Sequence, residues 1–415
     1  MLPSLLTRTA VPVVAVAAVL AGTTGCRSGT AGDPPTWVPQ PNYQGNNDPR
    51  PQLPAPRLPA PSPSDSSSGS APPPGPSGSA PTGTPATDPA VLATKLNQPT
   101  GLVVLPDGTA LVGERTTGRI LRVQPVPGRP ATPVQRLVVD GSGDGGLLDL
   151  AISPTFDQDG LVYAYLSTAT DNRVVHFALG SPPSAIVTGI PKGRTGNAGR
   201  LAFDATGALL IGTGDAGQPA LAASTSSLAG KILRTSDIGR PLPSNPLPSS
   251  PVFSLGLRSV DGLCVDTRTG LRIAISAGTP GVGGDADEVN VIRPDNDYGW
   301  PGNLSSSVDP LRTLPPALGG GGGCAIAAGR LFVATSTGRS LAVSNLTQGS
   351  GGAVTLGAFS PALQNRYGRL ATVVAAPDGA LWLTTRNRDG QGRPTADDDR
   401  VIRISPSDDT ASPIT

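Results

Sequence analysis

Five acidic residues crowd one short stretch of the chain, GGDADEVNVIRPDNDYGWPG at 283–302: Asp285, Asp287, Glu288, Asp295 and Asp297. Carboxylate and carbonyl oxygens on glycine-rich turns suit a hard cation, and calcium fits better than a transition metal. Solvated turn acids are the alternative interpretation. With three cysteines and one histidine in the chain, zinc sites built from Cys and His are excluded.

Two other motifs carry less chemistry. GTGDAG at 212–217 matches a dinucleotide-binding fingerprint, but Gln218 and Pro219 follow where a helix would have to open, so we interpret it as part of a hairpin. His176 shares one face of a strand with Val174 and Ala178. We expect this lone histidine to be structural. A Ser-His-Asp triad could use no other histidine.

The chain of 415 residues carries a net charge of +1 and only 15% charged residues. It therefore lacks the basic field that holds a nucleic-acid backbone, and we expect no nucleic-acid partner. Aromatic residues make up 3% of the chain. The core must therefore be built from Val, Leu, Ile and Ala.

The first 26 residues predict export. Arg8 precedes an apolar run over 10–21 that is too short to span a bilayer, as in a signal peptide. The run ends in TTGC, which resembles a bacterial lipobox with Cys26 as the lipidated residue. We therefore expect a lipid anchor on the outer face of the cell membrane. Ordinary secretion, with Cys26 as an incidental thiol, is the alternative.

Residues 27–91 form the next predicted region. Positions 27–90 hold 18 prolines mixed with Ser, Gly and Ala, a composition that buries too little apolar surface to offset its ordering entropy. We expect a disordered linker that keeps the folded domain away from the membrane.

From residue 92 one unit recurs: a strand of apolar residues, a turn with Asp or Gly, and a second strand. Repeats of about 40–50 residues made of short strands are typical of β-propellers. No apolar stretch of helical period separates them, which disfavours a parallel α/β sheet. The sequence predicts an all-β, six-bladed β-propeller over 92–408, followed by a tail at 409–415. The turn glycines are Gly108, Gly160, Gly207, Gly270, Gly329 and Gly379.

Cys264 lies in the fourth repeat and Cys324 in the fifth. In an oxidising compartment such an isolated pair is expected to form a disulfide bond. Two buried, reduced thiols that pack as small apolar residues are the alternative.

Seven ordered motifs resemble those of the soluble quinoprotein glucose/sorbosone dehydrogenase family, and the N-terminal region resembles that of actinobacterial lipoproteins in it. The resemblance covers roughly residues 96–406. It implies a six-bladed propeller that oxidises aldoses with pyrroloquinoline quinone (PQQ) and calcium. The motifs are GGLLDLAISPTF (145–156), NAGRLAF (197–203), GTGDAG with SLAGKILR (227–234), GLRSVDGL (256–263), GGDADEVN (283–290), NDYGWPG (296–302) and NRDGQGRPTADDDRVIRI (387–404).

The resemblance also assigns residues, and here the chain departs from the family. Gly196 stands where the family has its histidine base, and Asp144 stands in place of a substrate-side glutamine. Asp144 is our candidate for a replacement base. Calcium is assigned to Glu288 and Tyr298, which keep the family's spacing, together with Asp285 and Asp287. The cofactor-binding candidates are Arg258, Ser259, Asp261, Lys231, Arg386 and Arg388.

Loss of the histidine leaves the function open at this point. The first hypothesis is a PQQ-dependent sugar oxidoreductase with a degenerate active site. The lost histidine matters to this hypothesis because a general base contributes about 10²–10⁴-fold to the rate. The second is a non-catalytic module, expected to be a monomer, that binds a cell-wall glycan or a protein partner in the central funnel. A calcium-dependent lactonase is a weaker third hypothesis.

Overall fold

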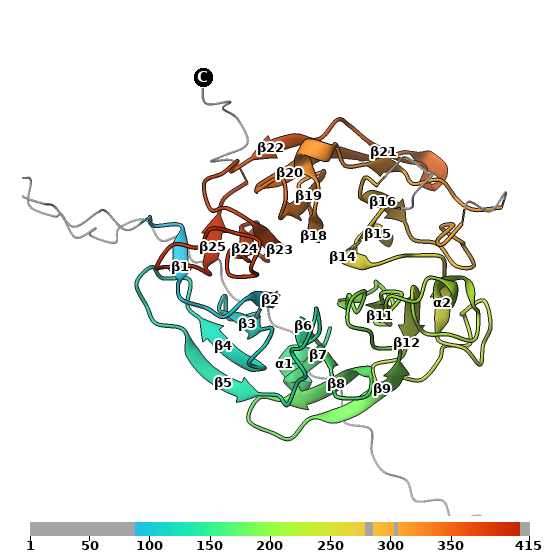
Figure 1. Ribbon diagram of the computed structural model, residues 1–415, viewed down its shortest axis with the longest axis horizontal. Coiled ribbons are helices and arrows are strands. Elements are labelled where there is room, and N and C mark those ends of the chain that lie inside the picture. Colours follow the sequence, from blue (N-terminus) through green and yellow to red (C-terminus); the bar gives the residue numbers. More distant parts are fainter. Residues whose placement is uncertain (1–87, 279–284, 303–305, 407–415) are drawn as a thin grey trace, which may run out of the picture. The chain divides into compact units, whose positions relative to one another are not determined.

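The computed structural model describes residues 88–278, 285–302 and 306–406, and within them six small antiparallel sheets surround a central axis (Figure 1). The predicted all-β, six-bladed propeller is confirmed. The expectations for the signal peptide, for Cys26, for most of the linker and for the tail at 409–415 concern residues outside this part. No helix within the described residues has the length and apolar character to cross a bilayer.

The chain enters each blade along its innermost strand and moves outward. Blade 1 contains β2 (Pro99–Val104), β3 (Ala110–Glu114), β4 (Arg119–Val123) and β5 (Thr132–Arg136). Blade 2 contains β6 (Leu147–Ile152), β7 (Leu161–Ser167), β8 (Asn172–Ala178) and β9 (Ser184–Ile190). Blade 3 contains β10 (Arg200–Phe203), β11 (Leu209–Gly212), β12 (Ile232–Thr235) and β13 (Val252–Ser254).

The other three blades follow the same plan with two differences: blade 5 has an additional strand, and the outermost strand of blade 6 precedes blade 1 in the sequence. Blade 4 contains β14 (Val260–Asp266), β15 (Leu271–Ser276), β16 (Glu288–Val291) and β17 (Arg312–Thr313). Blade 5 contains β18 (Gly321–Ala327), β19 (Arg330–Thr335), β20 (Ser340–Gln348) and β21 (Val354–Leu356), and β22 (Ser360–Ala362) also pairs with β20. Blade 6 contains β23 (Leu370–Ala375), β24 (Leu381–Thr385) and β25 (Val401–Ile404), and β1 (Val91–Ala93) is its outermost strand.

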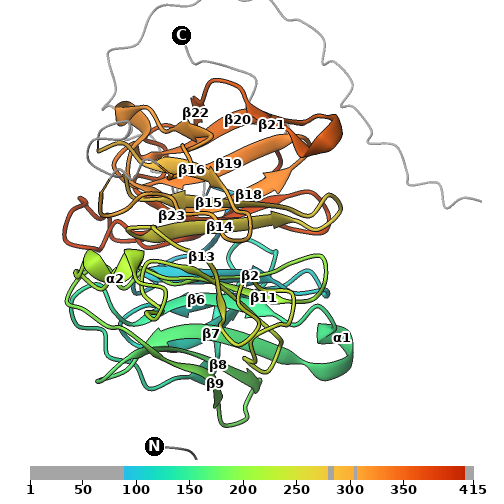
Figure 2. The ribbon, with the colours of Figure 1, turned by 90° about the vertical axis from the view of Figure 1, so that its right-hand side faces the viewer.

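The described helices are single turns in connections. They are α1 (Phe156–Asp159), α2 (Ala220–Ala223) and the 3₁₀ turns η1 (Pro316–Leu318) and η2 (Ser350–Gly352). Figure 2 shows α1 and α2 on opposite faces of the ring. α2 comes after the end of β11, the second strand of blade 3, and α1 comes after the end of β6, the innermost strand of blade 2. Because innermost and second strands run in opposite directions, the two helical turns lie at opposite ends of the strands.

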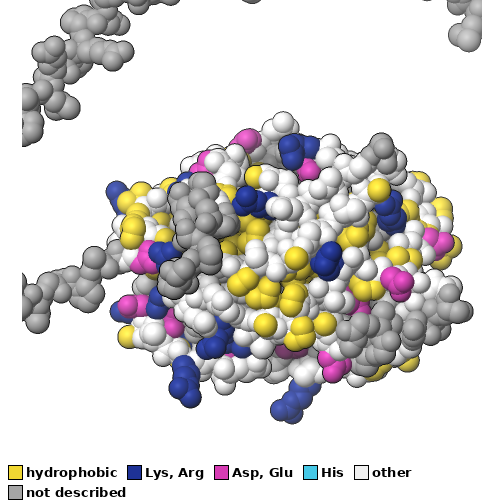
Figure 3. All heavy atoms as spheres, turned by 90° about the horizontal axis from the view of Figure 1, so that it is seen from above, with side chains coloured by type: hydrophobic (Ala, Val, Ile, Leu, Met, Phe, Trp, Pro, Cys, Tyr) yellow, Lys and Arg dark blue, Asp and Glu magenta, His cyan; other side chains and the backbone are white. Residues whose placement is uncertain are grey.

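Val, Leu, Ile and Ala build the core, as the low aromatic content requires. Each of six apolar clusters fills the space between two neighbouring blades, so the ring itself organises the core. Trp382 of blade 6, for example, packs in one cluster with Leu102 and Val112 of blade 1. On the rim seen in Figure 3, basic and acidic side chains are interspersed.

A disulfide bond links two neighbouring blades, as the sequence predicts. Cys264 on β14 and Cys324 on β18 join blades 4 and 5, with their Cα atoms 5.6 Å apart. In the chain-entropy model, closing a loop of this length stabilises the fold by roughly 3–5 kcal/mol.

The strand β1 closes the ring by pairing with β25, the last strand of the propeller. Just before it, the Asp88 carboxylate accepts a hydrogen bond from the Tyr367 hydroxyl (2.9 Å). The propeller therefore begins at about Asp88, a few residues before the boundary at 92 that the sequence predicts, because this segment supplies the outer strand of blade 6.

Candidate active site

The residues that precede the innermost strands lie at one end of the propeller, which we call the mouth. Antiparallel pairing brings the ends of the second strands to the same end: Pro99 pairs with Glu114, Arg200 with Gly212 and Leu370 with Thr385. Segments far apart in the sequence therefore meet at the mouth. Most of the predicted site residues lie in these segments.

Asp144, the predicted replacement base, is an exposed residue just before β6. Its Oδ2 accepts a hydrogen bond from the backbone N–H of Gly196 (2.7 Å), and its Oδ1 accepts one from the Asn197 side-chain amide. Asn197 is 1% exposed and also donates to the Gly193 carbonyl. A main-chain donor and a buried amide thus hold the carboxylate against Gly196.

Gly196 occupies a position that has no room for a side chain. Its φ is +72°, and an added Cβ would lie 2.5 Å from Oδ1 of Asp215. Asp215 is itself fixed by the indole N–H of Trp300, which donates to its Oδ2 at 2.9 Å. The Ala216 N–H donates to the Gly196 carbonyl (2.8 Å), which fixes the same turn from the other side.

Arg258 lies next to this turn. Its guanidinium sits over the Trp300 ring, 5.0 Å from the centroid, and one N–H reaches the Gly278 carbonyl at 3.4 Å. The Arg258 carbonyl accepts from the Asp215 N–H (2.9 Å). An exposed cation on an aromatic face is thereby placed beside Asp215 and Gly196.

Asp261, also predicted, lies at the start of β14 and accepts a hydrogen bond from the Ser259 hydroxyl (3.0 Å). Burial raises the pKa of Asp261 to about 7; Asp287 adds to the rise, while Arg200 and Arg386 oppose it. The Arg200 Nε donates to the Asp261 carbonyl at 2.6 Å. Arg200 of blade 3, Asp261 of blade 4 and Arg386 of blade 6 thus place charges in one region near the propeller axis.

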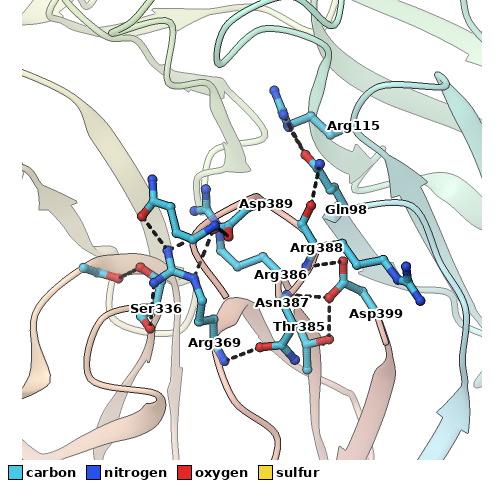
Figure 4. A network of polar contacts seen from close by, with 12 residues as sticks. Gln98, Arg115, Ser336, Arg369, Thr385, Arg386, Asn387, Arg388, Asp389 and Asp399 are labelled. Atoms are coloured by element: carbon cyan, nitrogen blue, oxygen red, sulfur yellow. Dashed lines mark hydrogen bonds and ion pairs between the residues drawn. The ribbon is translucent and has the colours of Figure 1, made fainter. Parts of the chain in front are cut away.

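The arginines of blades 6 and 1 form the network in Figure 4. Arg386 and Arg369 both donate to the Asp389 carboxylate, at 3.2 and 2.9 Å. Arg115, at the end of β3, donates to Oε1 of Gln98, and the Gln98 amide donates to the Arg388 carbonyl. Arg386 follows β24 as Arg115 follows β3, so the two occupy equivalent places in their blades.

Lys231, a predicted cofactor ligand, binds the protein's own backbone instead. It is fully buried, and its Nζ donates to the carbonyls of Leu221, Ala222 and Ala229 at 2.7–2.8 Å. Burial lowers its pKa to about 8. These donors join α2 to the backbone at Ala229, and all three N–H groups of Lys231 are used there, so these contacts do not favour its assignment to a cofactor.

Arg388, another predicted cofactor ligand, is exposed, but its side chain turns toward the loop before β25. Its Nε donates to the Asp398 carbonyl at 2.5 Å, and its Nη2 reaches the carbonyls of Thr395 and Ala396 at 3.4 and 3.5 Å. Arg388 thus braces this loop, whereas the Arg386 guanidinium, among the residues that the structure describes, donates only to Asp389.

The four predicted calcium residues do not converge. Asp287 accepts from the Gly321 N–H (2.7 Å), and the Tyr298 hydroxyl donates to the Val291 carbonyl (2.7 Å). Glu288 is 2% exposed beside Ser276 and Asn290, while Asp285 is exposed. In the part of the chain that the structure describes, no three His, Cys, Asp or Glu residues gather as a metal-binding group.

The two remaining motifs behave as expected. His176 lies on β8, the third strand of blade 2, with its ring 5.6 Å from that of Tyr163. It therefore lies away from the innermost strands. GTGDAG continues β11 into a turn, and α2 beyond it has only four residues. A dinucleotide-binding helix is thus not formed there.

Several residues at the mouth were missed by the sequence analysis: Gln98, Arg115, Asn197, Asp215, Trp300, Arg369 and Asp389. Burial lowers the pKa of Arg115, and Arg386 lowers it further, whereas Asp144 and Asp389 raise it. These groups therefore lie within electrostatic reach of each other. The sequence feature that could have identified the seven missed residues is their position. Each of them borders an innermost strand, follows a second strand or lies in one of the family motifs.

Comparison with known proteins matches residues 96–308, just over half of the chain, to the Glucose / Sorbosone dehydrogenase family. The aldose sugar dehydrogenase YliI of Escherichia coli (strain K12) is 30% identical over an alignment of 229 positions that covers 51% of this chain and 61% of that protein. The match thus spans about three fifths of that relative's length.

Two solved structures are similar over more of their length. The PQQ-bound aldose sugar dehydrogenase of Streptomyces coelicolor has 38% identity and a TM-score of 0.70, over 75% of this chain and 95% of that one. A putative oxidoreductase (glucose dehydrogenase) of Thermus thermophilus has 37% identity and a TM-score of 0.69, over 75% and 98% of the two chains. This chain belongs to the glucose/sorbosone dehydrogenase family.

Proposed function

We propose that this protein is a PQQ-dependent aldose dehydrogenase whose degenerate active site uses the Asp144 carboxylate in place of the family's histidine. The observation that carries the proposal is the hydrogen bond from the Gly196 N–H to Asp144 (2.7 Å). It holds a carboxylate beside the backbone position from which the histidine would project. Asp144 is also exposed, so a sugar hydroxyl can reach it.

The cations at the mouth fit an anionic cofactor. PQQ is a tricarboxylate, and Arg386 and Arg258 are the residues that would hold its carboxylates. Within the described residues Arg386 uses one N–H on Asp389, and Arg258 makes one long contact with the Gly278 carbonyl. PQQ, when bound, supplies the hydride acceptor for sugar oxidation.

The chain's own residues then manage charge and protons. Asp144 would accept the proton of the sugar's C1 hydroxyl as the general base. Asn197 keeps the carboxylate oriented through its buried amide. Because the pKa of Asp261 is about 7, this group is only partly ionised near neutral pH. Its repulsion of a bound tricarboxylate is correspondingly reduced.

The proposal includes a calcium ion at one position only, beside Glu288. Glu288 is buried beside Asn290, whose Oδ1 is buried without a hydrogen-bond partner among the described residues. Carboxylate and amide oxygens are the donors that calcium takes, and other oxygens would have to complete its shell of about six to eight ligands. The test is thermal unfolding with calcium and with a chelator: a loss of stabilisation in Glu288→Gln supports this site, and equal stabilisation of both proteins contradicts it.

The decisive experiment for the function is a titration of the purified protein with PQQ in calcium buffer, followed by absorbance. Aldoses and an artificial electron acceptor are then added, and dye reduction is measured. We expect saturable binding and sugar-dependent reduction. Absence of both would refute the proposal.

A non-catalytic binding module is the second candidate, and one observation favours it. Lys231 and Arg388, two cations expected at the cofactor, donate to backbone carbonyls instead. This candidate predicts binding of a cell-wall glycan or a protein at the mouth without PQQ binding. Persistence of that binding in the double variant Asp144→Ala/Asp261→Ala would argue against a site at the mouth.

We also propose that the protein works outside the cytoplasm, anchored through Cys26. The support is the N-terminal sequence, with its apolar run, its TTGC motif and its proline-rich linker. Fractionation of cells that produce Cys26→Ala tests this: release of the variant from the membrane is expected, and unchanged retention would contradict the anchor.

A further inference from the structure

A cavity lies beside Asp144, among the loop before β6, the turn between β7 and β8 and the connection from β9 to β10. Its volume is about 540 Å³, within the range of small-molecule sites. It adjoins Asp144 because Asp144 follows Gly143 in the chain and its N–H donates to the Arg194 carbonyl (3.2 Å). The lining residues are Ser142, Gly143, Ala169, Thr170, Lys192, Gly193 and Arg194.

The cavity is cationic. Lys192 lines it and forms an ion pair with Asp140. Arg194 is exposed, and within residues 88–278, 285–302 and 306–406 its guanidinium has no hydrogen-bond or ion-pair partner. A guanidinium with free donors binds carboxylate and phosphate oxygens in bidentate geometry. Arg194 therefore offers an anionic ligand group free donors in this cavity, while the charge of Lys192 is shared with Asp140.

The backbone segments that form the walls pack closely against each other. Gly143 has a φ of +60°, and a Cβ there would overlap the Arg194 carbonyl oxygen. Arg115 donates from Nη1 to the Gly143 carbonyl (3.1 Å), which ties the wall to the arginine network. Ser142 and Thr170 add hydroxyl groups that suit sugar hydroxyls.

We propose that this cavity binds the anionic group of an acidic aldose, a carboxylate or a phosphate ester, while the sugar's reducing carbon faces Asp144. The inference rests on the proposed function for the reaction itself. Its own content is the substrate class: sugars with a negative charge bind better than neutral aldoses because Arg194 and Lys192 lie beside the base.

The test measures binding by isothermal titration calorimetry on the protein without PQQ. Glucuronate is the carboxylate probe, glucose 6-phosphate is the phosphate probe and glucose is the neutral reference. We expect at least one acidic sugar to bind more tightly than glucose. Arg194→Ala is expected to weaken its binding by about tenfold, the effect of one charge-assisted contact.

Two further variants sharpen the result. Arg240 is an exposed arginine in the loop after β12, outside the cavity lining, and Arg240→Ala is expected to leave acidic-sugar binding unchanged. Asp140→Asn removes the carboxylate that pairs with Lys192. It is therefore expected to tighten binding of the acidic sugar by a few-fold.

Equal binding of all three sugars, or equal loss in Arg194→Ala and Arg240→Ala, would overturn the inference. Because the measurement needs no turnover, its failure is distinct from failure of the proposed function. Glucose oxidation without a preference for acidic sugars would refute only the cavity. Arg194-dependent binding without any oxidation would refute only the dehydrogenase.

Discussion

The two sides of the mouth are built differently. On the side of blades 2 and 3, the Asp144 carboxylate is held by a main-chain N–H and by the buried amide of Asn197. On the side of blades 6 and 1, Arg369 and Arg386 share the Asp389 carboxylate (Figure 4). One side presents a carboxylate held by two amide N–H donors, and the other presents guanidinium groups that share a carboxylate.

This difference assigns a task to each side. A fixed carboxylate suits proton transfer, which requires accurate placement of one atom. Arginines that share a carboxylate suit the binding of an anion, because each keeps donors for a ligand. The two sides are coupled through Arg115, whose pKa responds both to Arg386 and to Asp144. We therefore expect the sugar on the side of blades 2 and 3, with one of the cofactor's carboxylates opposite it at Arg386.

The largest expected effect comes from restoring the family's histidine on the carboxylate side. Gly196→His forces a side chain into the left-handed region and against Asp215. We expect a loss of about 2–4 kcal/mol in the free energy of unfolding, measured by urea denaturation, and no gain in activity.

Gly128→Ala is the matched control, because Gly128 has a φ of +78° with nothing within 4 Å of the added Cβ. It should cost about 1 kcal/mol. An equal loss in the two variants, or a more active histidine variant, would show that Gly196 is not sterically closed.

The next effect is on the arginine side. Arg386→Ala is expected to raise the Kd for PQQ by about 10–100-fold, since it removes charge-assisted hydrogen bonds. Arg388→Ala should change the Kd by less than about threefold and act mainly on stability, because Arg388 braces the loop at 395–398. The reverse ranking in absorbance titrations would contradict this division of roles.

A smaller expected effect is the pH dependence of PQQ binding. The Asp261 carboxyl, with its pKa of about 7, gains negative charge as pH rises from about 6 to about 8. PQQ binding is therefore expected to weaken by about three- to tenfold over this range. In Asp261→Asn the Kd should be nearly independent of pH, and a wild-type slope in this variant would remove Asp261 as the cause.

The same residue affects stability with a defined sign. Its pKa in the folded protein lies above the unfolded value of about 3.9, so the folded state binds the extra proton between these values. Its contribution to the free energy of unfolding therefore falls as pH rises from about 4 to about 7. In pH-dependent urea denaturation, Asp261→Asn should flatten this part of the stability profile.

The smallest expected effect is an increase in the affinity for PQQ, on the arginine side of the mouth. Asp389→Asn removes the charge that Arg369 and Arg386 share. PQQ is then expected to bind about two- to fivefold more tightly in absorbance titrations, since the two guanidinium groups no longer share their charge with a carboxylate. Weaker binding instead would mean that Asp389 positions the arginines more than it neutralises them.

The fold was predictable because its signal repeats. Each blade carries an apolar strand, a glycine turn such as Gly108 or Gly379 and a second strand, and these are local features. The closure by β1 was not predictable in the same way. Val91–Ala93 is three residues long and pairs with β25 at the far end of the chain.

The site was predictable only in part, because position in a blade does not determine where a long side chain turns. Lys231 and Arg386 were both expected at the cofactor, yet Lys231 points into carbonyls around α2 and Arg386 lies at the mouth. Arg115 was missed although it follows β3 as Arg386 follows β24. A comparison of equivalent blade positions would have found it.

The role of Asp144 as the base is tested most directly by the kcat of Asp144→Asn at saturating sugar, measured together with the Kd for PQQ. The amide keeps the size of the side chain and loses the proton acceptor. We therefore predict a fall in kcat of at least about 100-fold, with the Kd changed by less than about threefold. A kcat within about threefold of the wild-type value would contradict this role.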